Sequence, residues 1–268
     1  MSAPDGLLER LRGRVLPTVQ AVLPLVLRIA GARVPADARR RSCLVLAPHG
    51  DDEVLGCGAT ILARRSAGAR VVVAYVTDGG AFPDWLDPVD NVAKRLAETD
   101  SAAAALGLDK SDVVQLAFPD GLLESAERSG ALGAALERVL SDVQPDDVLT
   151  TSPWDPHPDH AALGRAVRSA VRPGGPRLLE YPIWQWESIL AWPRMLRDAH
   201  RPEIVRTKEH RQRKSEALMA YSSQLDVDQG GELPPGKGLP PVLFDRLTSG
   251  YEIFFPVHSA AADARARR

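Results

Sequence analysis

The sequence predicts an α/β fold: a Rossmann-like, three-layer arrangement of a mostly parallel sheet with helices on both faces. Short apolar runs that suit buried strands alternate along the chain with longer stretches whose apolar spacing suits helices. The run from Arg70 to Thr77 includes three successive valines, and this nearly continuous apolar character is typical of a parallel strand covered on both faces. The alternation predicts crossover units, in which a helix connects two parallel strands.

The first 40 residues predict a helical extension of this fold. Apolar residues between positions 6 and 31 recur at loose helical spacing, and Pro17 and Pro24 interrupt them. Because proline removes a helical hydrogen bond, we expect one or two short packing helices here.

The central part of the chain predicts five strands separated by four helices. The predicted strands cover residues 43–48, 70–77, 113–116, 147–151 and 178–181, and the predicted helices cover residues 54–67, 90–106, 123–140 and 161–171. Parallel pairing of these strands would place the loops that follow them along one edge of the sheet.

The last third of the chain is more irregular. Trp184, Trp186 and Trp192 lie among prolines, where a pocket wall or lid and ordinary core packing are equally good interpretations. The remaining predicted elements are a charged helix, a Gly- and Pro-rich mobile loop and an edge strand, at residues 206–221, 228–241 and 251–257 respectively.

The bulk properties predict a single catalytic domain over residues 1–268. A content of 44% hydrophobic and 25% charged residues is ordinary for a globular domain with one core. The net charge of −2 gives no general reason to expect nucleic acid or an anionic membrane as a partner, so we expect a small molecule. Self-association into a homo-oligomer is compatible with the sequence.

The cysteines and the N-terminus predict a cytoplasmic protein. Cys43 and Cys57 are too few for a disulfide framework and lack the Cys-x-x-Cys spacing of structural zinc sites. The first residues lack the features of a signal peptide, and no uncharged apolar run reaches the roughly 20 residues of a membrane-spanning helix. We therefore expect no stable membrane insertion.

Two polar clusters follow predicted strands. Residues 48–53 (Pro-His-Gly-Asp-Asp-Glu) follow the first strand, and residues 155–160 (Asp-Pro-His-Pro-Asp-His) follow the strand at residues 147–151. Open parallel sheets bind ligands beyond the carboxyl ends of their strands, so the clusters face each other if these two strands are neighbours. Helix capping would explain the aspartates, but not the histidines beside them.

The residue types in these clusters predict a catalytic metal site. One imidazole from each cluster and one carboxylate would give three ligands and leave one position open, as in catalytic zinc sites. Zinc lowers the pKa of water, and a nearby carboxylate can accept the proton. The successive carboxylates Asp51, Asp52 and Glu53 supply candidates for a ligand, a base and an orienting group.

These clusters resemble motifs of the LmbE-like or PIG-L superfamily of zinc-dependent de-N-acetylases. The resemblance extends from about residue 43 to residue 255, and its motif segments are residues 44–53, Arg95-x-x-Glu98, Phe118-Pro119-Asp120-Gly121, His157-Pro158-Asp159-His160 and residues 213–224. It implies zinc on His49, Asp52 and His160 and Asp51 as general base. Fe²⁺ is an alternative metal in the cell, because His and carboxylate ligands accept both ions.

The resemblance also implies roles for other residues. His157 would stabilise the oxyanion, and Asp159 would hold the His157 imidazole in its useful tautomer. Arg95 and Asp120 would contact sugar hydroxyls. Glu53 would orient a ligand.

The implied activity is removal of the N-acetyl or N-acyl group from an N-acetylglucosamine-type sugar on a small glycoconjugate, such as an antibiotic intermediate or a thiol precursor. The alternatives are a zinc amidase acting on a non-sugar conjugate and a non-catalytic sugar-binding module. Two positions depart from the family pattern: Gly50 replaces the usual Pro, and Asp155 replaces a Tyr of the mycothiol-pathway relatives.

Overall fold

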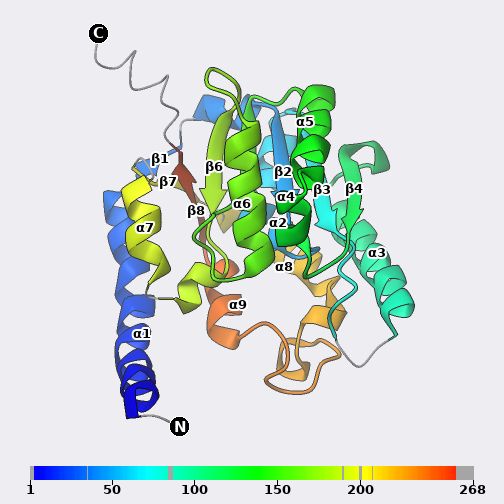
Figure 1. Ribbon diagram of the computed structural model, residues 1–268. Coiled ribbons are helices and arrows are strands. Elements are labelled where there is room, and N and C mark those ends of the chain that lie inside the picture. The colour runs from blue at the N-terminus through cyan, green and yellow to red at the C-terminus, as the bar shows by residue number, and fades with distance from the viewer. Residues whose placement is uncertain are drawn as a thin grey trace.

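The computed structural model confirms the predicted three-layer α/β architecture (Figure 1). It describes residues 3–34, 36–83, 87–188, 190–198, 201–206 and 208–257. The strands are β1 (Ala32–Arg33), β2 (Cys43–Ala47), β3 (Val71–Thr77), β4 (Val113–Phe118), β5 (Asp147–Thr151), β6 (Arg177–Tyr181), β7 (Glu203–Arg206) and β8 (Tyr251–Pro256). The α-helices are α1 (Ala3–Ala30), α2 (Asp52–Ser66), α3 (Pro88–Ala105), α4 (Leu123–Arg128), α5 (Ala131–Val143), α6 (Pro158–Ala170), α7 (Ala191–Asp198), α8 (Arg211–Met219) and α9 (Pro241–Leu247).

The described strands form one sheet in the order β1-β7-β8-β6-β5-β2-β3-β4. β2 lies between β3 and β5 and is parallel to both, with Cys43 paired to Val71 on one side and to Asp147 on the other. The carboxyl ends of β2 and β5 are therefore adjacent. This arrangement brings together the two polar clusters that the sequence placed after these strands.

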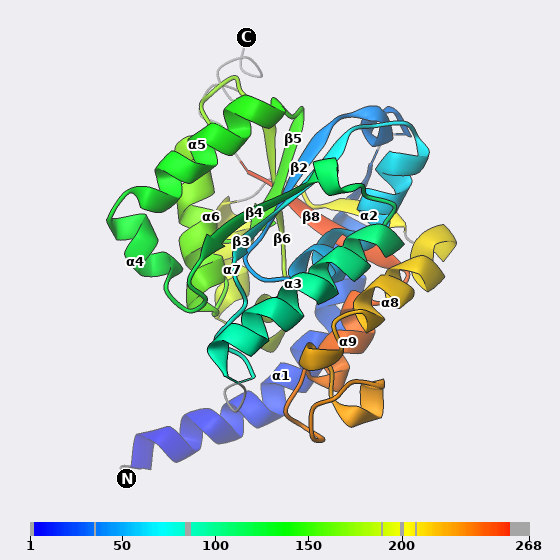
Figure 2. The same cartoon turned by 90° about the vertical axis from the view of Figure 1, so that its right-hand side faces the viewer.

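Helices cover both faces of the sheet, because successive residues of a strand point to opposite faces. Cys43, Val45 and Ala47 of β2 belong to a hydrophobic cluster that includes residues of α2, α3 and α8. Leu44 and Leu46 belong to a second cluster, which includes residues of α4, α5 and α6. Figure 2 shows these two sets of helices on opposite sides of the strands.

Two predicted helical segments differ from the structure. The N-terminal segment is a single long helix, α1, although Pro17 and Pro24 lie inside it. A proline removes one hydrogen bond at a time, and the intervening turns continue the helix. The predicted helix over residues 123–140 is two helices, α4 and α5, because Gly130 between them has a left-handed backbone (φ 80°).

The C-terminal part also differs from the prediction. β8 is not an edge strand: it lies between β7 and β6 and is antiparallel to both. The short strands β1 and β7 were not predicted, and the helix expected over residues 206–221 is limited to α8, because residues 203–206 pair with β8 instead. None of the described helices is long and apolar enough to cross a membrane.

Candidate functional site

The candidate site lies at the carboxyl ends of β2 and β5. His49 is in the loop between β2 and α2, and Asp52 is the first residue of α2. His157 precedes α6, and Asp159 and His160 lie in its first turn. Two loops far apart in the sequence thus meet, as predicted.

Three donor atoms in this site form a small triangle. The Nδ1 atom of His49 lies 3.4 Å from Oδ2 of Asp52, and Nε2 of His160 lies 3.2 Å from the same oxygen. The two ring nitrogens are 3.3 Å apart. These are the side chains that the resemblance implies as metal ligands.

The triangle has the dimensions of one face of a tetrahedral metal site. Ligand bonds of about 2.0–2.1 Å at tetrahedral angles place neighbouring donor atoms about 3.3–3.4 Å apart. The three measured distances fall within about 0.2 Å of this value. The three rings of His49, His157 and His160 also offer nitrogen atoms close enough to hold a single ion. The donor set therefore fits a divalent metal.

In both His49 and His160, the ring nitrogen that is not part of the triangle lies near a carboxylate. Nε2 of His49 lies 3.0 Å from Oδ1 of Asp120 and 3.3 Å from Oδ2 of Asp159. Nδ1 of His160 lies 3.4 Å from Oδ2 of Asp155. A carboxylate that accepts the proton of one ring nitrogen leaves the lone pair of the other free for a metal.

Asp155 is the functional position that the sequence analysis did not assign. Its side chain is fully buried, and it accepts hydrogen bonds from the backbone N–H groups of His157 at 2.9 Å and Trp184 at 3.3 Å. A carboxylate so held can orient His160. Its place at the start of the second polar cluster, two residues before His157, was the sequence signal for it.

Asp159 and Asp120 have partners other than the predicted ones. Asp159 accepts hydrogen bonds from the backbone N–H groups of Gly121 at 2.8 Å and Leu123 at 3.0 Å, and its closest ring contact is with His49. Asp120 also faces the His49 ring, although it lines the cavity described below. Control of the His157 tautomer by Asp159 therefore stays a prediction.

Burial and neighbouring charges shift the pKa values of the site. Burial opposes protonation of His160, but the charges of Asp52 and Asp155 outweigh it and raise the His160 pKa to about 9. Burial lowers the pKa of His157 to about 4, with a further contribution from His160 and His49. Burial and the charge of Asp52 raise the pKa of Asp51 to about 8.

The backbone at Asp51 is unusual and well supported. Its φ of 117° is rare for a residue with a side chain. The Asp51 N–H donates to Oε2 of Glu53 at 3.0 Å, and the other oxygen of Glu53 accepts hydrogen bonds from the hydroxyls of Tyr221 at 2.5 Å and Tyr75 at 3.1 Å. The buried Glu53 therefore holds the Asp51 backbone in place, and its predicted role of orienting a metal ligand stays a prediction.

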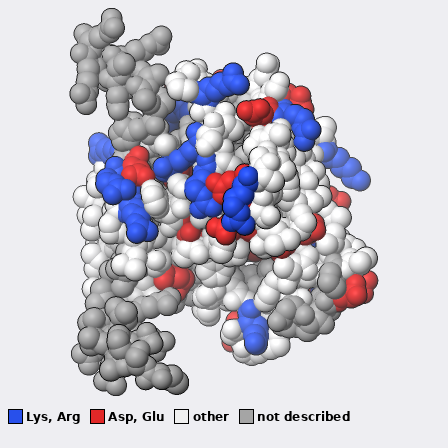
Figure 3. Space-filling model, viewed as in Figure 1, with Lys and Arg blue, Asp and Glu red and all other residues white. Residues whose placement is uncertain are grey.

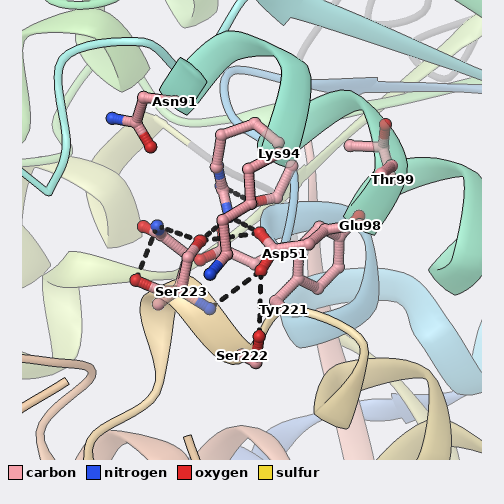
Figure 4. A network of polar contacts seen from close by, with 12 residues as sticks. Asp51, Asn91, Lys94, Glu98, Thr99, Tyr221, Ser222 and Ser223 are labelled. Carbon is pink, nitrogen blue, oxygen red and sulfur yellow. Dashed lines mark hydrogen bonds and ion pairs between the residues drawn. The ribbon is translucent and has the colours of Figure 1, made fainter. Parts of the chain in front are cut away.

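A second polar network fixes the carbonyl of Gly50. The guanidinium of Arg95 donates to the Gly50 oxygen and, at 3.0 Å, to Glu98. Glu98 in turn accepts hydrogen bonds from the backbone and hydroxyl of Ser223 at 2.8 and 2.7 Å. Figure 4 shows this network around Asp51 and Tyr221. Arg95 is thus bound largely by the protein itself, and its predicted contact with sugar hydroxyls stays a prediction.

The three donor atoms line a cavity of about 380 Å³. This volume is in the range of small-molecule sites. Asp51, Arg95, Asp120 and His157 also line it, so the predicted site residues other than Asp159 surround one space. Trp184 forms part of its wall, whereas Trp186 and Trp192 are buried against each other with ring centroids 4.6 Å apart. Trp184 therefore fits the interpretation as a pocket wall, whereas Trp186 and Trp192 fit the interpretation as core packing.

The segment predicted as a mobile loop forms another wall, with Lys237, Gly238 and Leu239 facing the cavity. The amide of Gln229 donates to the Leu239 carbonyl at 2.7 Å, and Lys94 of α3 pairs with Glu232. These contacts connect the segment to its surroundings. Its mobility stays a prediction.

Residues 44–171 match the PIG-L family, described as GlcNAc-PI de-N-acetylases. This segment of the chain is similar to the PIG-L family. The segment runs from β2 to the end of α6, so it contains both polar clusters.

Curated relatives match about half of the chain. A probable N-acetyl-α-D-glucosaminyl L-malate deacetylase of Bacillus cereus is 32% identical over 140 residues, which cover 49% of this chain and 61% of the relative. A 2′-N-acetylparomamine deacetylase of Streptomyces fradiae is 32% identical over 160 residues, which cover 53% and 57%. The chain therefore spans less than two thirds of the length of these relatives.

A solved structure matches over a greater length. The A40926 pseudoaglycone deacetylase aligns with a TM-score of 0.63 and 24% identity, covering 82% of this chain and 98% of that chain. At this identity the likeness shows the fold alone.

Proposed function

We propose that this protein is a zinc-dependent hydrolase that removes the N-acetyl group from an N-acetylglucosamine-type sugar on a small glycoconjugate. One observation carries the proposal: Nδ1 of His49, Oδ2 of Asp52 and Nε2 of His160 form a triangle of metal-ligand dimensions beside a cavity. The match of residues 44–171 to a family described as de-N-acetylases supports the reaction type.

His49, Asp52 and His160 would hold the metal. Two nitrogens and one oxygen form the mixed ligand set that zinc accepts readily, and Fe²⁺ remains an alternative. When bound, such an ion lowers the pKa of water and polarises a carbonyl group. Asp120, Asp155 and Asp159 would keep the two rings in the tautomers that the ion requires.

Asp51 would be the general base. It lines the cavity next to the ligand Asp52, and Glu53 fixes its backbone. A carboxylate at this place can accept a proton from the attacking water and transfer it to the leaving nitrogen.

His157 would stabilise the charge that develops on the amide oxygen. Its ring lies 4.9 Å from that of His49 and 4.8 Å from that of His160, and it lines the same cavity. Nδ1 of His157 is buried and has no hydrogen-bond partner among the described residues, so the protein itself does not use this nitrogen. A preorganised donor at this place supplies electrostatic stabilisation.

The cavity walls suit a sugar with an attached group. Trp184 offers an aromatic face for a pyranose ring, and Phe82, Ile183 and Leu239 add apolar surface. Asp120 and Arg95 also line the cavity and would contact sugar hydroxyls. The names of the curated relatives, which act on acetylated amino sugars, support this substrate class.

Acetate release and metal content test this proposal together. The purified protein is assayed with N-acetylglucosaminides that differ in aglycone and with N-acetyl amines of similar size that lack a sugar. We expect about one bound zinc per chain, and acetate release that requires the sugar and stops when a chelator removes the metal. Cleavage without sugar preference would favour an amidase, and sugar binding without metal or turnover would favour a binding module. The metal-site variant His160→Ala serves as the inactive control.

A further inference from the structure

We propose that the C-terminal half of α1 and the basic cleft beside it dock this protein onto an anionic lipid surface. This surface is separate from the candidate active site, and the proposal does not depend on the proposed function. It is defined by one cleft of about 780 Å³, whose lining includes Leu25 and Ile29 of α1 and the basic residues Arg28, Arg33, Arg206, Lys208 and Arg211.

The first observation is an unpartnered apolar stripe on α1. Val22 is three and four residues before Leu25 and Val26, which are in turn four and three residues before Ile29, so these side chains share one face of the helix. All four are exposed, from 49% for Val26 to 74% for Ile29. The opposite face of α1 is used for packing, with Leu27 only 3% exposed. In Figures 1 and 2, α1 lies at the periphery of the molecule.

The second observation is a concentration of uncompensated positive charge next to this stripe. Five basic residues line the cleft, and no carboxylate does among the described residues. Arg33, Arg206, Lys208 and Arg211 have no ion-pair partner in the part of the chain that the structure describes, and Arg28 lies over the Tyr251 ring at 4.8 Å. The face of the molecule in Figure 3, in contrast, carries basic and acidic side chains interspersed.

The two features adjoin each other, since Leu25 and Ile29 belong to both the stripe and the cleft. Helices that lie in the interface of a membrane combine an exposed apolar face with Lys and Arg beside it. The apolar stripe would enter the headgroup region, while the basic residues contact lipid phosphates. The net charge of −2 is a sum over the whole chain, so it gives no indication of this local concentration of positive charge.

Charge complementarity favours an anionic membrane over the other occupants. A symmetric dimer through this surface would bring the basic clusters of both copies together, which like-charge repulsion opposes. A nucleic acid would satisfy the basic residues but not the apolar stripe. An anionic lipid surface satisfies both features.

Vesicle sedimentation with the full chain tests the proposal. The probes are vesicles of phosphatidylcholine alone and vesicles in which about a third of the lipid is phosphatidylglycerol. We expect binding to the anionic vesicles that weakens with added salt, and little binding to the neutral ones. Each charge near such a surface contributes roughly fivefold to partitioning. Hence Arg206→Gln/Lys208→Gln/Arg211→Gln should lower partitioning on the order of 100-fold.

Matched variants separate the contributions of charge and apolar surface. Arg128→Gln/Arg138→Gln/Arg172→Gln removes the same charge from exposed positions elsewhere and should bind as the wild type does. Leu25→Ser/Ile29→Ser should weaken binding, whereas Val89→Ser/Leu96→Ser, at other exposed apolar positions, should not. Circular dichroism would confirm that each variant is folded.

Three outcomes would overturn the proposal. The first is equal binding to neutral and anionic vesicles, or equal loss in the two triple variants. The second is binding that depends on the charges but not on Leu25 and Ile29, which would indicate a site for soluble anions. The third is a concentration-dependent dimer that Ile29→Ser abolishes while vesicle binding is absent, which would indicate a self-association surface.

Discussion

Gly50 and Thr99 compete for the same space, because a Cβ atom added to Gly50 would overlap the Thr99 methyl group. The same Cβ atom would lie 3.1 Å from Cε1 of Tyr221. The backbone φ of Gly50 is not in the left-handed region, so glycine is needed here for room rather than for conformation. This contact explains why a larger residue such as the family's Pro does not fit in this chain.

Gly50→Ala should therefore displace the loop that carries Asp51. A shift of about 1 Å in a catalytic group can cost on the order of 100-fold in rate, so we expect kcat to fall by about 10- to 100-fold. Thr99→Ser removes the competing methyl group but keeps the hydroxyl that donates to the Leu96 carbonyl at 2.8 Å. It should be nearly neutral alone and should restore much of the activity in combination with Gly50→Ala. A double variant no better than Gly50→Ala would show that another contact is responsible.

The proposed base and the proposed ligand should respond differently to substitution. Asp51→Asn should retain the metal and lose most turnover, by about 10²- to 10⁴-fold, because the amide cannot accept the proton. His160→Ala should lose both, since it removes a donor from the triangle. Metal content by atomic absorption and acetate release distinguish the two variants. Near-normal rates with Asp51→Asn would remove Asp51 as the base.

Arg95 can act on the substrate or on the loop that carries the base. Its hydrogen bond to the Gly50 carbonyl and its contact with Glu98 favour the second role. Arg95→Gln should then lower kcat by about 10-fold or more with KM little changed. Arg95→Lys should recover part of this loss, because a single ammonium can still donate to the Gly50 carbonyl. A rise in KM at constant kcat would assign Arg95 to sugar binding instead.

Lys214 and Glu252 form a buried ion pair that connects α8 to α2 and β8. Nζ of Lys214 donates to Glu252 at 2.7 Å and to the Leu55 carbonyl at 2.8 Å, and Glu252 accepts hydrogen bonds from Thr60. Glu252→Gln should lower the free energy of unfolding by about 3–5 kcal/mol, because it leaves a buried charge unpaired.

Denaturant unfolding measures this effect. The control is Glu124→Gln, which breaks a contact with Arg165 between side chains that are 48% and 41% exposed. Exposed pairs contribute about 0–1 kcal/mol, so we expect little change. Equal effects of the two variants would contradict a structural role for the buried pair.

The local pattern of the sequence was sufficient to predict the central sheet. The strands at residues 70–77 and 147–151 were predicted within one residue of their observed bounds, since buried parallel strands require continuous apolar runs. The polar residues that end β2 and β5 predicted where the site lies. Residue types indicated a metal site between the two polar clusters, and the resemblance to a known family implied His49, Asp52 and His160 as its ligands.

Only the tertiary structure placed β8 inside the sheet and Asp120 beside His49. The place of a strand in a sheet depends on which segments pair, and Tyr251–Pro256 carries no local signal that it lies between β6 and β7. Arg95 donates a hydrogen bond to the carbonyl of Gly50, which is 45 residues away in the sequence, and only the fold brings the two residues together. Periodicity and residue type report the environment of one segment, because they arise from local geometry. Contacts between distant segments arise from the packing of the whole chain, so the partners of each site residue became visible only in the fold.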